Sequence, residues 1–216
     1  MAERPVFVPS LRGRRLVIEV PISFTWHPGM AASQKKKNVA ALHEAARGRG
    51  LNNILEVSSK SDFEIGRRLS AFHQRISVRG EMVSLESAFQ GSKVFENGGP
   101  YTDIIGLDPR SAKTDERLKQ SGRLTKFHLE GRDFPINPPT VFYDWLYFMA
   151  ISPARDWLKR LSKLDGFTDI EFNPERSVNC QAKSLALFVA LEKRGDLDGA
   201  LSSFEKLREI EADCFV

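Results

Sequence analysis

The feature that most limits how this chain can fold is the stretch TVFYDWLYFMAI at residues 140–151, which is apolar around nearly the whole circumference of a helix. Pro138 and Pro139 stand directly before it, where prolines favour the first turn of a helix. Because a helix that is apolar all round has no face to present to water, we predict a buried central helix here. The apolar run is too short to span a bilayer, so the remaining elements are expected to surround it in a globular fold.

The elements around this helix predict an α+β fold in which helices predominate and strands are few and short. Leu16, Ile18 and Val20 alternate as in a half-buried strand, and Pro21 either confines that strand to a sheet edge or ends it. Short strands are also predicted within NNILEV and FTDIEF, whereas the segment before Ser84 is expected to be an irregular loop. Because the strands do not alternate with helices, a doubly wound sheet is not expected.

The helices are predicted from capping residues and apolar spacing. Ser33 is expected to cap a helix with apolar residues at positions 39, 42 and 46, and Ser84 and Ser111 are expected to cap two more. Amphipathic or buried helices are further predicted at SPARDWLKRLSKL, AKSLALFVALEKRG and LDGALSSFEKLREIEA. No internal repeat or long linker interrupts the sequence, so one domain is expected.

Several classes of function lack their sequence signatures. There is no GxGxxG or Walker sequence for a nucleotide fold, and no GxSxG or HExxH for a hydrolase of those types. Cys180 and Cys214 stand far apart, and the four histidines show no pairing typical of a metal site or an acid/base dyad, so neither a metal ion nor a cofactor is expected. The first residues lack the apolar core of a signal peptide, which favours a cytoplasmic protein without a membrane partner.

The net charge of +4 permits contact with nucleic acid without requiring it. Basic residues are concentrated in one predicted helix and just after it, at Lys35, Lys36, Lys37, Arg47 and Arg49. This cationic patch either binds DNA phosphates or is a solvated helix face, and the second interpretation is the more common one for a run of lysines.

The stretch VSLESAFQGSKVF at residues 83–95 carries the most informative polar pattern. As one short helix, it would place Glu86, Gln90 and Lys93 at i, i+4 and i+7 on one stripe. Leu85 and Phe89 occupy the neighbouring apolar side, so the stripe would lie at the boundary of the core. Such a stripe either faces a cleft or is a solvated face with local ion pairing, and the spacing alone favours the solvated face.

Residues 69–95, LSAFHQRISVRGEMVSLESAFQGSKVF, resemble the central signature of the NADAR (YbiA-like) family, in which a Ser-containing turn precedes a Glu-containing helix that ends in a Gln and Lys-Phe pattern. Glu86, Phe89, Gln90 and Lys93 stand at the matching positions. The segments SSKS, GGPY, SAKTDERLKQSG, FYDWLY and FTDIEFNPERSVNCQA are similar to the branch of this family that is encoded beside DarT-type DNA ADP-ribosyltransferase toxins. The resemblance runs from about Pro5 to the helix after Asn179.

Two departures from the YbiA-like members favour the toxin-linked branch. SVNCQA replaces the Trp-Gly pair of their last motif, and Phe134 stands near the place of a Trp. The resemblance implies a single NADAR-like domain over residues 1–216. Its signature core would lie at 54–182, with the N-terminal strand and helix and the C-terminal helices as elaborations.

The activity implied by the resemblance is hydrolysis of ADP-ribose from guanine bases in DNA, which would make the chain an antitoxin to a DarT-type toxin. Glu86 would stabilise charge at ribose C1′ or deliver a proton to the departing base. Lys93 would either form a Schiff base with the opened ribose or bind the pyrophosphate as a cation. The alternatives are an N-glycosidase acting on phosphorylated riboflavin-pathway intermediates and a noncatalytic module that binds ADP-ribose or the toxin.

Further polar and aromatic residues of these motifs are candidates for binding the substrate. Each also has an ordinary structural interpretation: a buried carboxylate needs a partner, a tryptophan on an apolar helix belongs to the core, and serines and asparagines favour turns and caps. The candidates are Lys60, Ser61, Ser70, Phe72, Gln90, Tyr101, Asp144, Trp145, Asn173, Asn179 and Gln181.

Overall fold

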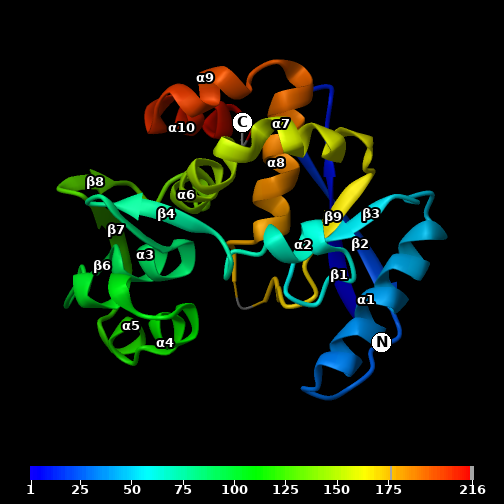
Figure 1. The fold of residues 1–216 in the computed structure, drawn as a ribbon, viewed down its shortest axis with the longest axis horizontal. Helices are drawn as coiled ribbons and strands as arrows, with labels where there is room; N and C mark the ends of the chain where they lie inside the picture. The colour runs from blue at the N-terminus through cyan, green and yellow to red at the C-terminus, as the bar shows by residue number, and fades with distance from the viewer. Residues whose placement is uncertain (176, 215–216) are drawn as a thin grey trace.

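One sheet brings together strands from the two ends of the predicted signature core and the N-terminus. The computed structural model describes residues 1–175 and 177–214 (Figure 1). The strands β1 (Ala2–Pro9), β2 (Val17–Phe24), β3 (Ile54–Glu56) and β9 (Gly166–Thr168) form this sheet in the order β2-β1-β9-β3. Strands β1 and β2 are antiparallel, and β3 runs parallel to β9. The parallel pair therefore sets segment 57–61 beside segment 169–173, both of which contain predicted site residues.

The prediction of an edge strand before residue 21 is confirmed for β2, but the strand does not end at the proline. Pro21 pairs with Pro5 of β1, and β2 continues to Phe24. An edge strand tolerates proline because its N–H need not take part in the ladder. The residues of β2 that face the core are Ile22 and Phe24.

A second part of the chain forms two small antiparallel sheets. Strands β4 (Arg75–Val78) and β5 (Glu81–Ser84) pair as a hairpin, and β6 (Lys93–Phe95), β7 (Leu124–Leu129) and β8 (Arg132–Phe134) form a sheet in that order. The prediction of an irregular loop before Ser84 is therefore wrong. The hairpin turns at Arg79 and Gly80, which both have positive φ angles, as a tight two-residue turn between right-handed twisted strands requires.

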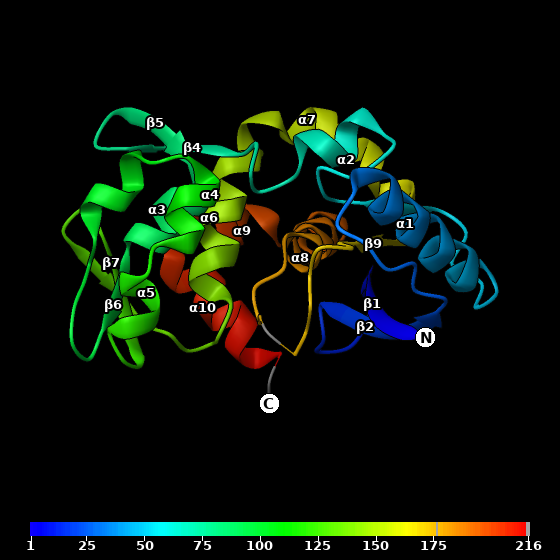
Figure 2. The same ribbon diagram turned by 90° about the horizontal axis from the view of Figure 1, so that it is seen from below.

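The buried central helix predicted at 140–151 is confirmed as α6 (Val141–Ile151). It packs against α8 (Gln181–Arg194) and α10 (Phe204–Asp213), while α9 (Leu197–Ser202) joins the latter two. In Figure 2, α8 is seen nearly end-on at the centre, with α6 and the green elements on one side and the β1–β2 hairpin with α1 (Ala32–Arg47) on the other. Helix α8 thus lies between the two parts of the fold that carry the predicted motifs.

Helix starts were predicted correctly at one serine and wrongly at two others. Ser84 Oγ accepts a hydrogen bond from the backbone N–H of Ser87 at 3.0 Å and caps α3 (Leu85–Gly91), as expected. Ser33 lies inside α1, which begins one residue earlier, after Ala31. Asp108, not Ser111, caps α4 (Pro109–Thr114), because its carboxylate accepts bonds from two backbone N–H groups of the first turn.

Shorter helices connect these elements. They are α2 (Glu64–Arg68), the 3₁₀ turn Thr102–Gly106, α5 (Arg117–Gln120), the 3₁₀ turn Ser152–Ala154, α7 (Arg155–Leu158) and the 3₁₀ turn Lys159–Lys163. The amphipathic helix predicted at 152–164 is therefore broken into three short turns.

The fold belongs to the α+β class, as predicted. More of the described residues lie in helices than in strands, but the strands in three sheets exceed the few that the sequence suggested. The larger of two apolar clusters draws on residues from Phe7 to Leu207, and the smaller one seals α1 onto the first sheet. The interpretation of residues 1–216 as one domain stays a prediction. Within the described residues, no helix has both the length and the apolar character needed to cross a membrane.

Candidate functional site

The short helix α3 is buried along its whole length and carries the central residues of the candidate site. The hairpin β4–β5 leads directly into it, and the Ser84 cap fixes its start. Glu86 lies in the first turn, where the positive end of the helix dipole favours a carboxylate. Its side chain is nearly fully buried, at 5% exposure. A buried carboxylate requires polar partners, and α3 supplies the first of them.

Glu86, Gln90 and Lys93 form a continuous hydrogen-bonded row. Gln90 Nε2 donates to Glu86 Oε1 at 2.9 Å, and Lys93 Nζ donates to Gln90 Oε1 at 2.7 Å. Gln90 thus acts as a spacer that presents its N–H to the carboxylate and its carbonyl to the ammonium or amine. The expectation that these three side chains lie together is met in space.

The route by which Lys93 reaches this row differs from the prediction. Helix α3 ends at Gly91, and Lys93 is the first residue of β6, where it pairs with Phe127 of β7. Gly91 packs so closely on Ile105 that a Cβ atom there would lie 2.5 Å from it, and this contact fixes the chain where the helix ends. The helical i+7 spacing for Lys93 is therefore wrong, because the chain turns at residue 92 and returns the side chain to Gln90.

The surroundings of Lys93 make its amine unusually acidic. Burial lowers its pKa from 10.5 to about 8; the nearby Glu86 carboxylate opposes this shift and the positive charge of Lys113 adds to it. The Lys93 Nζ also lies 4.7 Å from the centre of the Phe89 ring. At neutral pH, roughly a tenth of such a group is the neutral amine, whereas an ordinary lysine is almost entirely protonated.

This shift predicts a specific pH dependence. If neutral Lys93 is the reacting form, the rate constant kcat/KM for cleavage should rise about tenfold per pH unit up to about pH 8 and then level off. The sign follows from the pKa, because the fraction of neutral amine increases until pH exceeds it. If kcat/KM of the wild-type protein is constant between pH 6 and pH 8 while the protein stays folded, a neutral-amine step is contradicted.

Two tyrosines of α6 form the wall beside Glu86. Tyr143 and Tyr147 lie one helical turn apart on the same face, and both are buried. Tyr143 packs edge-to-face on Phe89 at 5.1 Å, and Tyr147 Oη donates to the carbonyl of Leu69 at 2.7 Å. Burial raises the pKa of both phenols well above 10, so they remain neutral. The i, i+4 spacing of the two tyrosines is present in the motif FYDWLY, but Asp144 and Trp145 were predicted from the sequence as the binding residues of this motif.

Among the predicted binding residues, three have buried polar atoms without a hydrogen-bond partner in the described part of the chain: Ser61 Oγ, Ser70 Oγ and Asn179 Oδ1. Buried polar atoms are normally paired, so these are available for a ligand or water. They belong to segments joined by Gln181, whose carbonyl accepts from the Ala71 N–H and whose amide donates to the Val57 carbonyl. Gln181 was predicted to bind substrate, whereas here both ends of its side chain hold backbone.

The remaining predicted residues divide into two groups. Phe72 is 45% exposed, and Lys60 is bonded to Ser59 Oγ at 2.8 Å; both lie on the segments that lead to and from α2. Asn173 caps its own turn, with Oδ1 accepting from the Glu175 N–H at 3.1 Å. These positions remain compatible with a binding surface beside α8.

Tyr101, Asp144 and Trp145 are not brought together with Glu86. The hydroxyl of Tyr101 bonds to Ser121, and the ring lies 4.6 Å from the guanidinium carbon of Arg117. Asp144 accepts from Ser184 Oγ and lines a separate cavity of about 430 Å³. Trp145 packs on Phe204 at 6.3 Å. The structural interpretations, namely a partnered carboxylate and a core tryptophan, describe these side chains.

No group of three or more His, Cys, Asp or Glu side chains in the described ranges is arranged to hold a metal ion. The row of Glu86, Gln90 and Lys93 itself brings together a carboxylate, an amide and an amine. The chain matches the model of the DarT1-associated NADAR antitoxin family over residues 2–213. It belongs to this family. No curated protein matches the chain.

The match covers the elements that carry the candidate site. A second hydrogen-bonded network, which the sequence did not reveal, lies at the end of β3. Glu56, at the end of β3, accepts hydrogen bonds from Ser58 Oγ at 2.5 Å, from Thr168 Oγ1 at 2.7 Å and from the Ile170 N–H at 2.9 Å. His43 reaches the same Thr168 hydroxyl at 2.8 Å. The network fixes segment 57–61 against β9, and no local pattern indicated it because Thr168 and Ile170 are more than a hundred residues from Glu56.

The Glu56 network predicts that this NADAR chain loses stability as pH rises. Burial raises the Glu56 pKa from 4.5 to about 8, with the Asp169 carboxylate adding to the shift. Since the folded state holds this proton more tightly than the unfolded state, the contribution is fully present below pH 4.5 and is lost as pH rises to about 8. Denaturant unfolding between pH 5 and pH 8 should show this decline, and Glu56→Gln should flatten it. Equal slopes in the two proteins would contradict the assignment.

Proposed function

We propose that this chain is an ADP-ribosyl glycohydrolase that removes ADP-ribose from guanine bases in DNA and acts as the antitoxin of a DarT1-type toxin. The observation that carries the proposal is the row Glu86–Gln90–Lys93, in which a buried carboxylate and an amine of lowered pKa face one site. Membership in the DarT1-associated NADAR antitoxin family supports the substrate class. The expected partners are ADP-ribosylated DNA and a cognate DarT-type toxin.

The two groups have the properties that cleavage of an N-glycosidic bond requires. The Glu86 carboxylate stabilises the positive charge that develops at ribose C1′ as the bond from C1′ to guanine lengthens. Neutral Lys93 Nζ adds to C1′, the bond from C1′ to guanine breaks, and the guanine nitrogen takes one proton from Nζ. Glu86 then carries the remaining Nζ proton to the ribose ring oxygen, the C1′–O bond breaks, and C1′ remains attached to Lys93 as a Schiff base.

Water completes the reaction. It adds to C1′, the bond to Lys93 Nζ breaks, and ADP-ribose leaves with an aldehyde at C1′ that recloses to the ring form. Glu86 accepts each proton from the water and passes it to Nζ, so that Lys93 leaves as the neutral amine and Glu86 ends as the carboxylate. The lowered pKa of Lys93 assists the addition step, because only the neutral amine carries the lone pair that attacks carbon.

The cationic patch of α1 contributes less free charge than its sequence suggests. Lys36 Nζ pairs with Asp62 at 2.7 Å and Lys35 Nζ with Glu171 at 3.5 Å. These pairs hold the first turns of α1 beside the segments that carry Ser61 and Asn173. A role of the patch in DNA binding stays a prediction.

The deciding experiment is hydrolysis of a guanine-ADP-ribosylated DNA oligonucleotide by the purified protein, with released ADP-ribose measured by chromatography. The proposal expects release that depends on enzyme concentration and restores the unmodified oligonucleotide. A folded protein that binds the oligonucleotide without releasing ADP-ribose would favour a noncatalytic reader. A protein that instead cleaves phosphorylated riboflavin-pathway intermediates would favour the other N-glycosidase activity.

A further inference from the structure

A second lysine approaches Glu86, at the same oxygen to which Gln90 donates. Lys113 lies on α4, which packs beside α3, and its Nζ is 4.0 Å from Glu86 Oε1. The same Nζ is 5.7 Å from the centre of the Phe72 ring, which belongs to the segment after α2. Lys113 therefore lies between Glu86 of α3 and Phe72, at a position that we call the mouth of the site.

Lys113 differs from Lys93 in how freely it can exchange its partners. Its side chain is 58% exposed, whereas the Glu86 side chain is almost fully buried. A pair at 4.0 Å with one exposed member contributes little to stability, so the side chain is not held there by a strong interaction. Phe72 is also exposed, and a cation over such a ring is bound only weakly. Lys113 can leave both partners at little cost when an anion enters.

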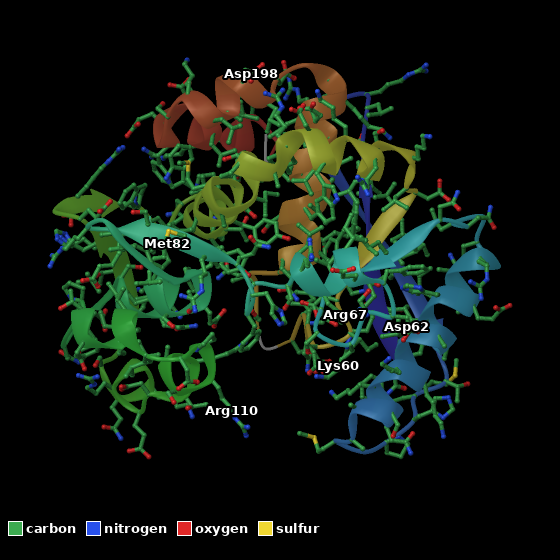
Figure 3. The ribbon with its side chains drawn as sticks, viewed as in Figure 1. Lys60, Asp62, Arg67, Met82, Arg110 and Asp198 are labelled. Atoms are coloured by element: carbon green, nitrogen blue, oxygen red, sulfur yellow. The ribbon has the colours of Figure 1, made fainter. Side chains whose placement is uncertain are left out.

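Three other cations on the neighbouring segments donate hydrogen bonds to groups of the protein. Lys93 donates to Gln90, and Lys60 donates to Ser59 Oγ. Arg67 donates to the backbone carbonyls of Ser61 and Asp62, both at 2.8 Å. Figure 3 shows Lys60 and Arg67 on the cyan segments and Arg110 on the green α4, along the same lower side of the molecule. Arg110 lies one helical turn before Lys113 on α4, so it adds positive charge on the same side as Lys113.

We propose that Lys113 binds the diphosphate of the ADP-ribosyl group, an inference that rests on the proposed function. The diphosphate begins one methylene group beyond the ribose ring, so a ribose whose C1′ lies at Glu86 and Lys93 places it near the mouth. An ammonium group on a flexible stem suits such an anion. When Lys113 moves to the diphosphate, the face of Phe72 is uncovered for stacking with a purine base.

The test compares Lys113→Ala and Lys113→Arg with wild type, with Lys119→Ala as the matched control. Lys119 is exposed and lies on α5, a different helix from the one that carries Lys113. ADP-ribose affinity is measured by calorimetry, and kcat and KM are measured with the ADP-ribosylated oligonucleotide. Melting temperatures establish that all four proteins are folded.

Loss of the ammonium should weaken ADP-ribose binding and raise KM by about 10- to 100-fold, the usual effect of losing a hydrogen bond to a charged group. The value of kcat should change little, Lys113→Arg should keep most of the affinity, and the salt dependence of binding should become less steep in Lys113→Ala. Lys119→Ala should match wild type in every measurement.

The outcomes separate this inference from the proposed function. If wild type neither binds ADP-ribose nor releases it from DNA, the proposed function fails, and this inference fails with it. If wild type binds and hydrolyses but Lys113→Ala behaves like Lys119→Ala, only the role of Lys113 is overturned. A fall in kcat at unchanged KM and unchanged ADP-ribose affinity would also overturn it, because Lys113 would then act by positioning Glu86. If wild type binds without hydrolysis and Lys113→Ala binds weakly, the diphosphate contact is supported while the activity is not.

Discussion

Replacing Lys93 with methionine is expected to lower the release of ADP-ribose from the modified oligonucleotide by about 10³-fold or more, as removal of a covalent nucleophile does. Methionine is unbranched like lysine and only one atom shorter, but it lacks the amine that attacks C1′. Because Lys93 is partly buried and donates only one hydrogen bond to a side chain, the fold should survive the change. Single-turnover release of ADP-ribose measures the effect.

Two companion variants identify what Lys93 does. Lys93→Arg keeps a positive charge without a usable amine, so it should be as inactive as Lys93→Met if the lysine is a nucleophile, and substantially active if it only binds phosphate. Lys126→Met removes an exposed lysine of the adjacent strand and should retain full activity. Borohydride treatment during turnover should attach ADP-ribose to Lys93 in wild type, located by peptide mass spectrometry. A fully active Lys93→Arg without a trapped adduct would contradict the Schiff-base step.

Glu86→Gln belongs to the same test because it removes the carboxylate while keeping the shape of the side chain. Its release rate should fall to a similar degree as in Lys93→Met, since the ring oxygen can no longer be protonated. The two losses should not add in the double variant, because the groups act on one reaction step. A double variant with the product of the two single losses would indicate that they serve independent functions.

The sequence predicted the centre of this site because its signal is local. Glu86 and Gln90 lie one helical turn apart, and the Ser84 cap together with the apolar neighbours Leu85 and Phe89 defined the helix that carries them. The same reasoning failed two residues later. The prediction extended the helix to Lys93. In the structure, Gly91 is the last residue of the helix, where it packs against Ile105, and Lys93 already pairs with β7 as part of β6. Those contacts come from segments more than ten residues away, where helical spacing carries no information.

Lys113 and Thr168 were missed from the sequence because these residues are far along the chain from the carboxylates that they contact. Lys113 is 27 positions from Glu86 in the sequence, and Thr168 is 112 positions from Glu56. Only the packing of α4 on α3 and the parallel pairing of β3 with β9 bring these residues together. Conversely, Tyr101 and Asp144 were predicted from their local motifs to bind substrate, and the structure pairs them with Ser121 and Ser184; their role in binding stays a prediction. A polar residue in a motif thus indicates a need for a partner, and the fold determines whether that partner is a ligand.

Phe142 connects the core to the site, and its replacement should have the largest effect on stability. Its ring stacks on Phe127 at 4.4 Å and contacts Phe134 at 4.8 Å, while Phe89 of α3 lies 6.3 Å away on the same cluster. Phe142 is 1% exposed. Phe142→Ala should therefore lower the free energy of unfolding by about 3–5 kcal/mol, the usual cost of a large cavity in a core. Denaturant unfolding measures this change.

The cavity left by Phe142→Ala should also lower the rate of cleavage, because Phe89 links this part of the core to α3. Phe89 stands between Glu86 and Lys93, and it packs on Phe127 at 5.4 Å as well as on the Phe142 cluster. When the ring of Phe142 is absent, α3 can shift toward the space it leaves, and a displacement of about 1 Å at reacting groups lowers rates by up to about 10²-fold. Phe63→Ala is the matched control, because that ring is 63% exposed and should cost less than about 0.5 kcal/mol. If Phe142→Ala loses stability but keeps full activity at a temperature where it is folded, the position of α3 is maintained by its cap and by β6 rather than by the aromatic cluster.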